Sequence, residues 1–383
     1  MPCCRSSSKG GRNVRSVLLL LAFGTAGWAQ MKPGSAAAEG ISPARLERAV
    51  AILDAEVKAG RLGAASLLVA RHGRIVLQSG FGSAGVGSVF LLASITKPVT
   101  AAAVMLLVER GLVSLGDPVE RYLPEFQGGE RGKVRVRDLL SHTSNLPDML
   151  PENTKLRREH APLAEFVRRT VATPLLYPPG TEFRYQSMGV LLAGEIVERL
   201  TRMPLRDFLR REIFEPLGMR ASSLGLGGRK VEDLVPVMDP PGAVAADEQG
   251  FGWNTTYWRD LGVPWGGMHA STADLALLLQ AFLDGGAGVF SPATVRAMLT
   301  DQNGRLNAPW GIGWALGRSR AWNVFGDLVS PRAFGHTGST GTAAWADPET
   351  GLIAIVLTNR PLAHDDGRLL RAVSNAVAAS VEK

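Results

Sequence analysis

Two side chains in the first third of the chain, those of Ser94 and Lys97, have the types and the spacing that covalent acyl transfer requires. A serine hydroxyl becomes an effective nucleophile when a neighbouring group accepts its proton, and a lysine amine can be that group. The apolar run after Ser94 predicts a helix to about Arg110, and residues three apart lie on one face of a helix. The first helical turn also offers unpaired N–H groups to a developing negative charge. The pair is therefore a candidate nucleophile and base.

Two motifs later in the chain contain groups that could complete such a site. The first is Tyr185-Gln186-Ser187, which follows a Pro-Pro-Gly turn signal and precedes an apolar run. The second is His336-Thr337-Gly338-Ser339-Thr340-Gly341, whose glycines would let a substrate backbone approach a strand closely. Each motif also fits an ordinary structural position, and Ser-x-x-Lys itself recurs at Ser6 and Ser380. The order of the three motifs therefore carries more weight than any one of them.

The sequence shows no pattern that indicates a metal or an organic cofactor. The candidate metal ligands are His142, His269, His336 and Asp274. Their positions lack the close spacing of zinc motifs such as His-x-x-x-His. We therefore expect chemistry that needs neither a metal nor a cofactor.

Taken in order, Ser-x-x-Lys, Tyr-x-Ser and His-Thr-Gly make the chain resemble the serine β-lactamase/penicillin-binding protein superfamily. Within it, the chain is most similar to class C β-lactamases, D-aminopeptidases and family VIII carboxylesterases. Other segments that agree with the family pattern are 139–147, 215–219, 266–268, 271–275, 347–348 and 358–359. The resemblance extends from about residue 43 to residue 380. It implies an α/β (α+β) fold of the β-lactamase type: an antiparallel sheet flanked by N- and C-terminal helices, plus a helical lobe, with the active site between the lobes.

The resemblance assigns a role to each motif. Ser94 would be the nucleophile that becomes acylated, and Lys97 would either accept its proton or keep Tyr185 deprotonated. Tyr185, whose pKa positive surroundings would lower, would pass a proton to the leaving group and activate the deacylating water. The backbone N–H groups of Ser94 and Ser339 would bind the oxyanion. The residues that would line the substrate are His336, Thr337, Gly338 and Ser187.

Two of the positions that depart from the family pattern bear on the substrate. Ser187 stands where the second motif ordinarily has Asn, whose amide contacts the acyl side-chain carbonyl of β-lactams. His336 stands where the third motif often has Lys, and an unperturbed histidine is mostly neutral at pH 7. Both changes weaken recognition of an anionic β-lactam or of a peptide C-terminus, but they leave the nucleophile and the base in place.

We therefore expect a serine hydrolase that forms an acyl-enzyme at Ser94 and acts on small esters. β-Lactam hydrolysis and cleavage of D-amino-acid amides or peptides are the nearest alternatives. A non-catalytic scaffold that binds cell-wall peptides or a partner protein is the alternative from another class. The expected ligand of an enzyme is a small-molecule ester, amide or β-lactam.

The elements that must bring these motifs together fall into two groups. Candidate helices are 43–59, 94–110, 136–141, 163–172, 187–201, 204–213, 272–284 and 368–381, and candidate strands are 64–70, 74–78, 311–316, 333–336, 341–346 and 352–358. Strands and a helix at both ends predict a single domain, 43–383, with an α/β lobe (about 43–115 and 305–383) and a helical lobe (about 116–304). A site is expected in the cleft between the lobes.

The N-terminal segment has the pattern of a secretory signal peptide. Residues 1–15 carry four basic side chains and no acidic one, an apolar run follows at 17–23, and small residues precede Gln30. We expect a signal peptide at 1–29, a flexible lead-in at 30–42, and a periplasmic or secreted protein; an uncleaved membrane anchor is the alternative. Cleavage would remove Cys3 and Cys4, the only cysteines. No later segment reaches the ~18 apolar residues of a membrane span.

The charge pattern argues against nucleic acid as a ligand. The chain has 42 basic and 35 acidic residues, and loss of residues 1–29 would reduce its net charge from +7 to +3. Much of the remaining positive charge is arginine spread over predicted helix faces, such as Arg168, Arg206 and Arg210. A nucleic-acid binder would more often show a basic stripe with interleaved aromatic residues. We therefore expect no nucleic-acid partner.

Overall fold

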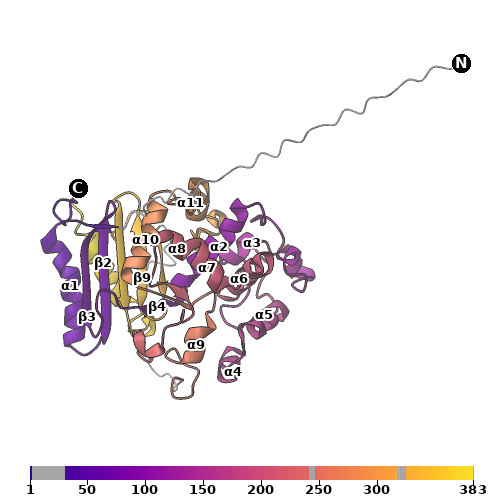
Figure 1. Cartoon of the computed structure of the whole chain (residues 1–383), viewed down its shortest axis with the longest axis horizontal. Helices are drawn as coiled ribbons and strands as arrows, with labels where there is room; N and C mark the ends of the chain where they lie inside the picture. Colours follow the sequence, from indigo (N-terminus) through magenta and orange to yellow (C-terminus); the bar gives the residue numbers. More distant parts are fainter. Residues whose placement is uncertain (2–30, 241–245, 318, 320–324, 383) are drawn as a thin grey trace.

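The computed structural model describes residues 31–240, 246–317, 319 and 325–382, as well as Met1. Figure 1 shows two parts side by side: a sheet flanked by helices, and a group of helices that surrounds α2 (Thr96–Glu109). Strands from both ends of the chain build the sheet, which agrees with the fold class predicted from the sequence. Apart from Met1, the predicted signal peptide lies outside the described residues.

A seven-stranded, mostly antiparallel sheet forms the first part. In spatial order its strands are β1 (Lys32–Pro33), β3 (Arg74–Gly82), β2 (Ala64–Arg71), β10 (Leu352–Thr358), β9 (Thr342–Asp347), β8 (Phe334–Gly338) and β7 (Ala315–Leu316). β10 joins the two ends of the chain, because Ile355 lies opposite Leu68 of β2 on one side and Ala344 of β9 on the other. All residues of β2, β9 and β10 are buried, which explains why these strands consist largely of apolar residues.

Helices cover both faces of the sheet. α1 (Pro43–Lys58) and α12 (Arg368–Ala378) pack together on one face, where Leu53 and Val373 are buried. α10 (Thr272–Leu283) contacts β2, β9 and β10. The sequence-based assignment placed 272–284 in the helical lobe, whereas these contacts put α10 against the sheet as well. Leu275 and Leu279 of α10 belong to the core that runs from the sheet into the helical part, so α10 serves both.

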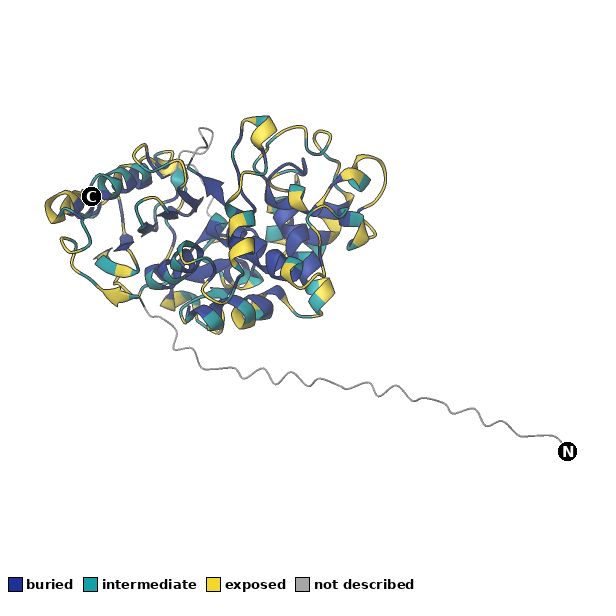
Figure 2. Cartoon of the chain, turned by 90° about the horizontal axis from the view of Figure 1, so that it is seen from above, coloured by how far each residue is buried: buried dark blue, intermediate teal, exposed yellow. Residues whose placement is uncertain are grey.

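The second part consists of helices and short connections. Residues 96–107 of α2 are all buried, and α2 packs against α6 (Met188–Thr201). The other helices are α3 (Val136–Leu140), α4 (Asn153–Arg158), α5 (Leu163–Ala172), α7 (Leu205–Leu209), α8 (Glu215–Leu217), α9 (Thr256–Leu261) and α11 (Pro292–Leu299). Figure 2 shows that buried residues occupy the interior of both parts, whereas exposed residues lie on outward-facing helices and loops. α2 is thus a central helix, and its N-terminus is fixed by packing around it.

A small second sheet holds the chain just before α2. β4 (Phe90–Leu91) pairs with β6 (Met268–Ala270), which also pairs with β5 (Ser223–Leu224). The N–H of Leu92 donates to the Met268 carbonyl at 2.9 Å, which extends the pairing towards α2. The sequence indicates a loop-and-strand stretch at 89–93, which contains β4, but strands as short as β5 and β6 carry no periodic pattern and were not predicted. They tie the start of α2 to segment 263–270, far away in the chain.

Two predicted segments differ from the structure. The lead-in that was expected to be flexible is ordered over 31–42: β1 pairs in parallel with β3, and the fully buried Ile41 bridges to Val381. The strand predicted at 311–316 is limited to β7, because Gly313 has a positive φ of 79° that interrupts extended backbone. The predicted bounds of α5 and β10 agree with the structure.

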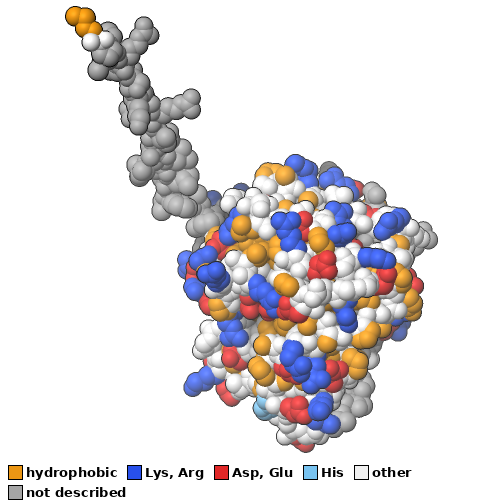
Figure 3. Space-filling model, turned by 90° about the vertical axis from the view of Figure 1, so that its right-hand side faces the viewer, with side chains coloured by type: hydrophobic (Ala, Val, Ile, Leu, Met, Phe, Trp, Pro, Cys, Tyr) orange, Lys and Arg blue, Asp and Glu red, His pale blue; other side chains and the backbone are white. Residues whose placement is uncertain are grey.

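Charged side chains of both signs alternate on the surface. Figure 3 shows Lys and Arg interspersed with Asp and Glu on one face of the molecule. Many arginines are ion-paired with nearby acids; Arg199, for example, pairs with Glu125 and Glu195. Exposed pairs of this kind contribute little to stability, but they neutralise much of the basic charge locally. Within the described part of the chain, no helix combines the length and apolar character needed to cross a bilayer.

Candidate active site

Ser94 lies at a sharp transition from strand to helix. A single 3₁₀ turn, Ala93–Ile95, connects β4 to α2. Ala93 has a positive φ of 46°, which is uncommon for a residue with a side chain and turns the chain abruptly. Thr96 holds this turn: its hydroxyl donates to the Ala93 carbonyl at 2.7 Å and accepts from the Met268 N–H at 3.0 Å. Ser94 is thereby fixed, half-buried, at the first helical turn.

Lys97 is buried next to Ser94. Only 1% of its surface is exposed, and its Nζ lies 2.9 Å from Ser94 Oγ and 3.1 Å from the Trp265 carbonyl oxygen. Burial penalises the charged amine and lowers the pKa of Lys97 to about 7, although the charge of Asp148 acts in the opposite direction. Protonated Lys97 donates to Ser94 Oγ, whereas the neutral amine can accept the Ser94 proton. Near neutral pH both forms of Lys97 are present.

Tyr185 lies against the same pair. The Nζ atom of Lys97 is 4.8 Å from the centroid of the Tyr185 ring, and the Ser94 side chain is near enough to the phenol to affect its pKa. Burial raises the pKa of Tyr185 above its ordinary value and outweighs the opposing effect of the Ser94 side chain. The sequence-based expectation of a lowered tyrosine pKa is therefore wrong, and the phenol is protonated at neutral pH. Of the two candidate bases, Lys97 is the one that titrates near neutrality.

His336 is close to Tyr185 and is uncharged at neutral pH. It is fully buried on β8, and its ring centroid lies 6.0 Å from that of Tyr185. Its Nδ1–H donates to the Thr337 carbonyl at 2.6 Å. Burial, assisted by the charge of Lys97, lowers the pKa of His336 to about 3. Thr337 is also buried, and its hydroxyl has no hydrogen-bond partner among the residues described. The third motif thus brings a neutral imidazole to the site where a relative with Lys would have a cation.

Other aromatic rings hold Tyr185 in place. The ring centroids of His142 and Trp310 lie 4.5 and 6.0 Å from that of Tyr185. His142 is buried in a left-handed conformation, with a φ of 61°, and its Nδ1 accepts the Gln186 N–H at 3.2 Å. Sequence reasoning considered His142 only as a metal ligand and did not place it beside Tyr185. His142 could have been identified as a site residue from its position in segment 139–147, which matches the family pattern.

The turn after β8 is tied to the backbone in front of Ser94. The Thr342 hydroxyl donates to the Leu92 carbonyl at 2.9 Å. Gly338 permits this approach, because a Cβ atom there would lie 2.0 Å from the same carbonyl oxygen. Ser339 follows and is exposed at the turn. The backbone segments that contain Ser94 and Ser339, to which the resemblance assigns the oxyanion N–H groups, therefore lie side by side.

Ser187 contacts Asp148, a residue that the sequence analysis did not identify as part of the site. It is buried at the start of α6, and its hydroxyl donates to Asp148 Oδ1 at 2.6 Å, so its one donor is used within the protein. Asp148 itself is exposed, and its charge raises the pKa of both Lys97 and Tyr185. In the sequence, Leu-Pro-Asp has the composition of an ordinary turn. Only the fold brings Asp148 next to a motif 39 residues further along the chain.

The structure separates the other candidate ligands. His269 is buried in the small sheet, with its Nδ1 on the Gly225 carbonyl at 3.0 Å, and Asp274 caps the backbone at Ala221 with a 2.8 Å hydrogen bond. In the ranges that the structure describes, no three His, Cys, Asp or Glu side chains are grouped so as to hold a metal ion. The residues that do converge are a hydroxyl, an amine, a phenol and a neutral imidazole.

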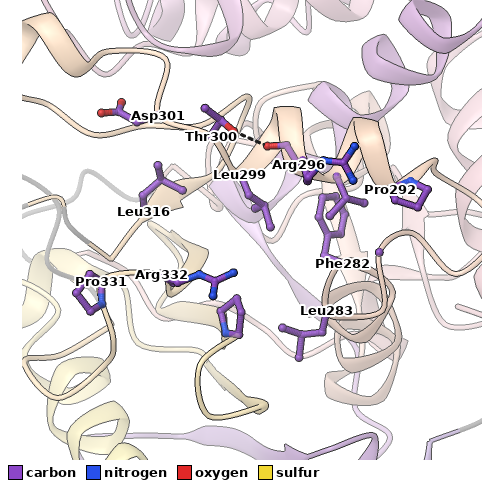
Figure 4. A pocket seen from close by; sticks show the side chains of 13 residues that line it. Phe282, Leu283, Pro292, Arg296, Leu299, Thr300, Asp301, Leu316, Pro331 and Arg332 are labelled. Atoms are coloured by element: carbon purple, nitrogen blue, oxygen red, sulfur yellow. Dashed lines mark hydrogen bonds between the residues drawn. The ribbon is translucent and has the colours of Figure 1, made fainter.

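A cavity of about 510 Å³ lies away from these residues (Figure 4). It is enclosed by the C-terminal end of α10, by α11, and by the loop before β8, with Phe282, Leu299 and Leu316 among its apolar side chains. Arg296 and Arg332 also line it. None of the residues assigned to the candidate site contributes to its wall. We therefore do not assign the acyl substrate of Ser94 to this cavity.

The fold is that of the serine β-lactamase/penicillin-binding protein superfamily. The family model described as Beta-lactamase matches residues 49–378, and the chain belongs to this family. Proteins with this fold are typically serine hydrolases. The resemblance recognised in the sequence is thereby confirmed.

Three relatives show which kinds of protein the chain is similar to. A protein of Salmonella agona (strain SL483), named "Putative D-alanyl-D-alanine carboxypeptidase", is 29% identical in an alignment that covers 77% of this chain and 78% of that protein. EstCE1, described as a hydrolase with promiscuous acyltransferase activity, has a TM-score of 0.73 at 22% identity over 88% of this chain and 99% of its own. The D-amino acid amidase of Ochrobactrum anthropi SV3 has a TM-score of 0.68 at 23% identity over 88% and 99%. The fold is thus shared by proteins whose names refer to different acyl compounds.

Proposed function

We propose that this protein is a serine hydrolase that forms an acyl-enzyme at Ser94 and cleaves small carboxylic esters. The observation that carries the proposal is the 2.9 Å contact between Lys97 Nζ and Ser94 Oγ. Burial makes the neutral amine available at physiological pH, and only a neutral amine can accept the serine proton. A non-catalytic scaffold has no need for a buried lysine in this state.

The geometry supports the following sequence of steps. Neutral Lys97 accepts the Ser94 proton while Oγ attacks the ester carbonyl, and the oxyanion is stabilised by the N–H groups of Ser94 and Ser339. As the intermediate collapses, the Tyr185 phenol gives its proton to the departing alkoxide, and the ammonium of Lys97 then reprotonates the phenolate. The alcohol leaves and Ser94 carries the acyl group. In the deacylation step a water molecule attacks the acyl carbonyl and gives a proton to the Lys97–Tyr185 pair. This pair returns a proton to Ser94 as the free acid leaves.

The lack of a fixed cation among the described residues near Ser94 favours an ester over an anionic substrate. A β-lactam or a peptide C-terminus carries a carboxylate, for which a permanent cation is the natural partner. In this chain His336 occupies the position where the third motif often has Lys, and its low pKa leaves the imidazole uncharged. The Ser187 hydroxyl donates to Asp148, so it is not free to bind a substrate as the amide of an Asn at this position would be. Both observations support a substrate without a carboxylate.

Cleavage of D-amino-acid amides or peptides is the second candidate function. It is supported by the 29% identity to the Salmonella agona protein, whose name refers to a D-alanyl-D-alanine carboxypeptidase. Acyl transfer from an amide uses the same nucleophile and base, with an amine as leaving group. The two functions therefore differ in the substrate and not in the machinery.

A panel of substrates tests the proposal. Purified protein is given a short-chain nitrophenyl ester, a cephalosporin and a D-alanyl amide side by side, and the Ser94→Ala variant is assayed in parallel. We expect the ester to be hydrolysed fastest and the variant to lose this activity with an almost unchanged Tm. Ester turnover that survives in Ser94→Ala would place the chemistry elsewhere, and selective turnover of the amide would favour the second candidate.

We also propose that the protein acts in the periplasm or outside the cell. The proposal is supported by the N-terminal charge pattern and by the small residues before Gln30. Fractionation of expressing cells, followed by determination of the N-terminus, should give an exported protein that begins at Gln30. A cytoplasmic protein that retains residues 1–29 would contradict the proposal, and a membrane-bound one would indicate an uncleaved anchor.

A further inference from the structure

Asp148 places a negative charge beside the candidate site, where it contacts Ser187 of the second motif. The residue is exposed, as is its neighbour Met149, so its carboxylate is accessible to a small molecule. At the same time its field reaches the buried Lys97 and Tyr185 and raises the pKa of both. The exposed carboxylate of Asp148 therefore lies near enough to the buried pair to act on a small molecule that reaches Ser94.

The carboxylate of Asp148 is held in a fixed orientation. Ser187 donates its hydroxyl to Oδ1 at 2.6 Å and its backbone N–H to the Asp148 carbonyl at 3.3 Å. Ser187 is 99% buried and begins α6, so the carboxylate is attached to a rigid element. Among the described residues, the other oxygen of Asp148 accepts no hydrogen bond, and no Lys, Arg or His comes within 4.0 Å of the carboxylate. That oxygen is available to a ligand.

Among the residues of the candidate site that the structure describes, no other fixed charge balances Asp148. His142 and His336 are neutral because burial depresses the pKa of each far below 7. Lys97 must itself be neutral when it acts as the base. In its reactive state the site therefore has a net charge of about −1, which attracts cations and repels anions.

We propose that Asp148 determines specificity by selecting esters, or amides, whose acyl part carries a protonated amine, and by excluding those whose acyl part carries a carboxylate. The proposal rests on the hydrolase function assigned to Ser94 and names its substrate class. The free oxygen of Asp148 would accept a hydrogen bond from the substrate ammonium while Ser94 attacks the neighbouring carbonyl. At a separation of several ångströms near a protein surface, one unit charge changes the ratio of kcat/KM between a cation and its neutral isostere by about tenfold.

Three methyl esters of nearly equal size test this proposal. β-Alanine methyl ester carries a cation, methyl butyrate is neutral, and monomethyl succinate carries an anion. Hydrolysis of each is followed in a pH-stat, with wild type, Asp148→Asn, Asp148→Glu and a control, Asp54→Asn. Asp54 is an exposed acid of α1 paired with Lys58, and its replacement changes the net charge equally. Each enzyme is measured on its own pH plateau, because loss of Asp148 also shifts the titration of Lys97.

We expect wild type to prefer the cation to methyl butyrate, and methyl butyrate to the anion. Asp148→Asn should reduce the cation-to-anion ratio of kcat/KM by about tenfold or more and retain methyl butyrate hydrolysis, while Asp148→Glu and Asp54→Asn keep the preference. A ratio that is unchanged in an active Asp148→Asn variant would overturn the proposal. If Asp148→Asn does not fold, the salt dependence of the wild type tests the proposal instead. Its cation-to-anion ratio of kcat/KM should decrease between about 0.05 and ~0.5 M salt, and a ratio that does not depend on salt would overturn the proposal. Failure of the hydrolase function is a different result, namely no ester turnover that depends on Ser94.

Discussion

The Nζ atom of Lys97 lies 2.9 Å from Ser94 Oγ, and the Trp265 carbonyl fixes the same amine at 3.1 Å. Because the lysine is almost completely buried, its ammonium form is penalised and its pKa is about 7. An amine with this pKa at this distance can accept the serine proton without an intervening group. The proposed chemistry therefore depends on how deeply one lysine is buried.

Replacement of Lys97 with Met should abolish ester hydrolysis without unfolding the protein. General-base catalysis typically contributes 10²–10⁴-fold, so kcat should fall by about 100-fold or more. Met fills a similar volume and removes a buried ionisable group, which is often neutral or stabilising, so Tm should stay equal or rise. The matched control is Lys155→Met on α4, an exposed lysine, which should retain activity. Wild-type kcat in Lys97→Met would contradict the assignment of the base.

The pH dependence of kcat/KM should follow the titration of Lys97. Its pKa in the folded protein is about 7, so the amine is protonated and unreactive below this value and neutral above it. The rate should rise with pH through about 7 and reach a plateau near pH 8, whereas an ordinary lysine would titrate near ~10.4. His336 does not interfere, because its pKa of about 3 lies far below this window. A profile that is flat from pH 5.5 to 9 would show that no group of this pKa limits the rate.

Replacement of Tyr185 with Phe should affect substrates according to their leaving group. The phenol is protonated at neutral pH and serves as a proton donor to the departing alkoxide. A methyl ester has a poor leaving group that needs this proton, whereas nitrophenolate leaves without it. The variant should therefore lose about 10²–10⁴-fold in kcat on the methyl ester and much less on the nitrophenyl ester. Equal losses on both esters would exclude proton donation as the function of Tyr185.

Replacement of Gly338 with Ala should disrupt the turn that carries Ser339. The added Cβ would lie 2.0 Å from the Leu92 carbonyl oxygen, so the backbone before Ser94 or the β8 turn must move. Overpacking of this kind typically costs about 1–3 kcal/mol, and displaced oxyanion donors lower kcat by about 10²–10³-fold. Gly304→Ala is the control, because its Cβ would meet no atom closer than 3.5 Å. A Gly338→Ala variant with wild-type kcat and Tm would show that this close approach is unimportant.

Much of the fold could be predicted from local sequence signals, and the exceptions have physical causes. The bounds of β10 and α5 agreed with the structure because apolar runs and turn residues mark both ends. The three-residue strand β6 carries no such signal, and it forms by pairing with β4 and β5, which lie far away in the chain. The ordered segment 31–42 was likewise missed, since its order comes from pairing with β3 and with Val381 near the other end of the chain.

At the site, motif order was sufficient to place Ser94, Lys97 and Tyr185 together, but not to predict their electrostatics. The sign of the tyrosine pKa shift was wrong because it depends on burial, which only the fold determines. Asp148 could not be found, because its importance arises from a hydrogen bond to Ser187 across 39 residues and from its exposure beside a buried lysine. Long-range proximity of charges is the part of the site that local sequence does not encode.

The most direct test of the account is to locate the covalent adduct. The protein is treated with a fluorescent phosphonate, digested, and analysed by mass spectrometry, with Ser94→Ala and Lys97→Met treated in the same way. The account predicts one phosphonyl group per chain on the peptide that contains Ser94, none in Ser94→Ala, and much slower labelling of Lys97→Met. An adduct on another residue, or ester turnover by an enzyme whose Ser94 never becomes modified, would contradict it.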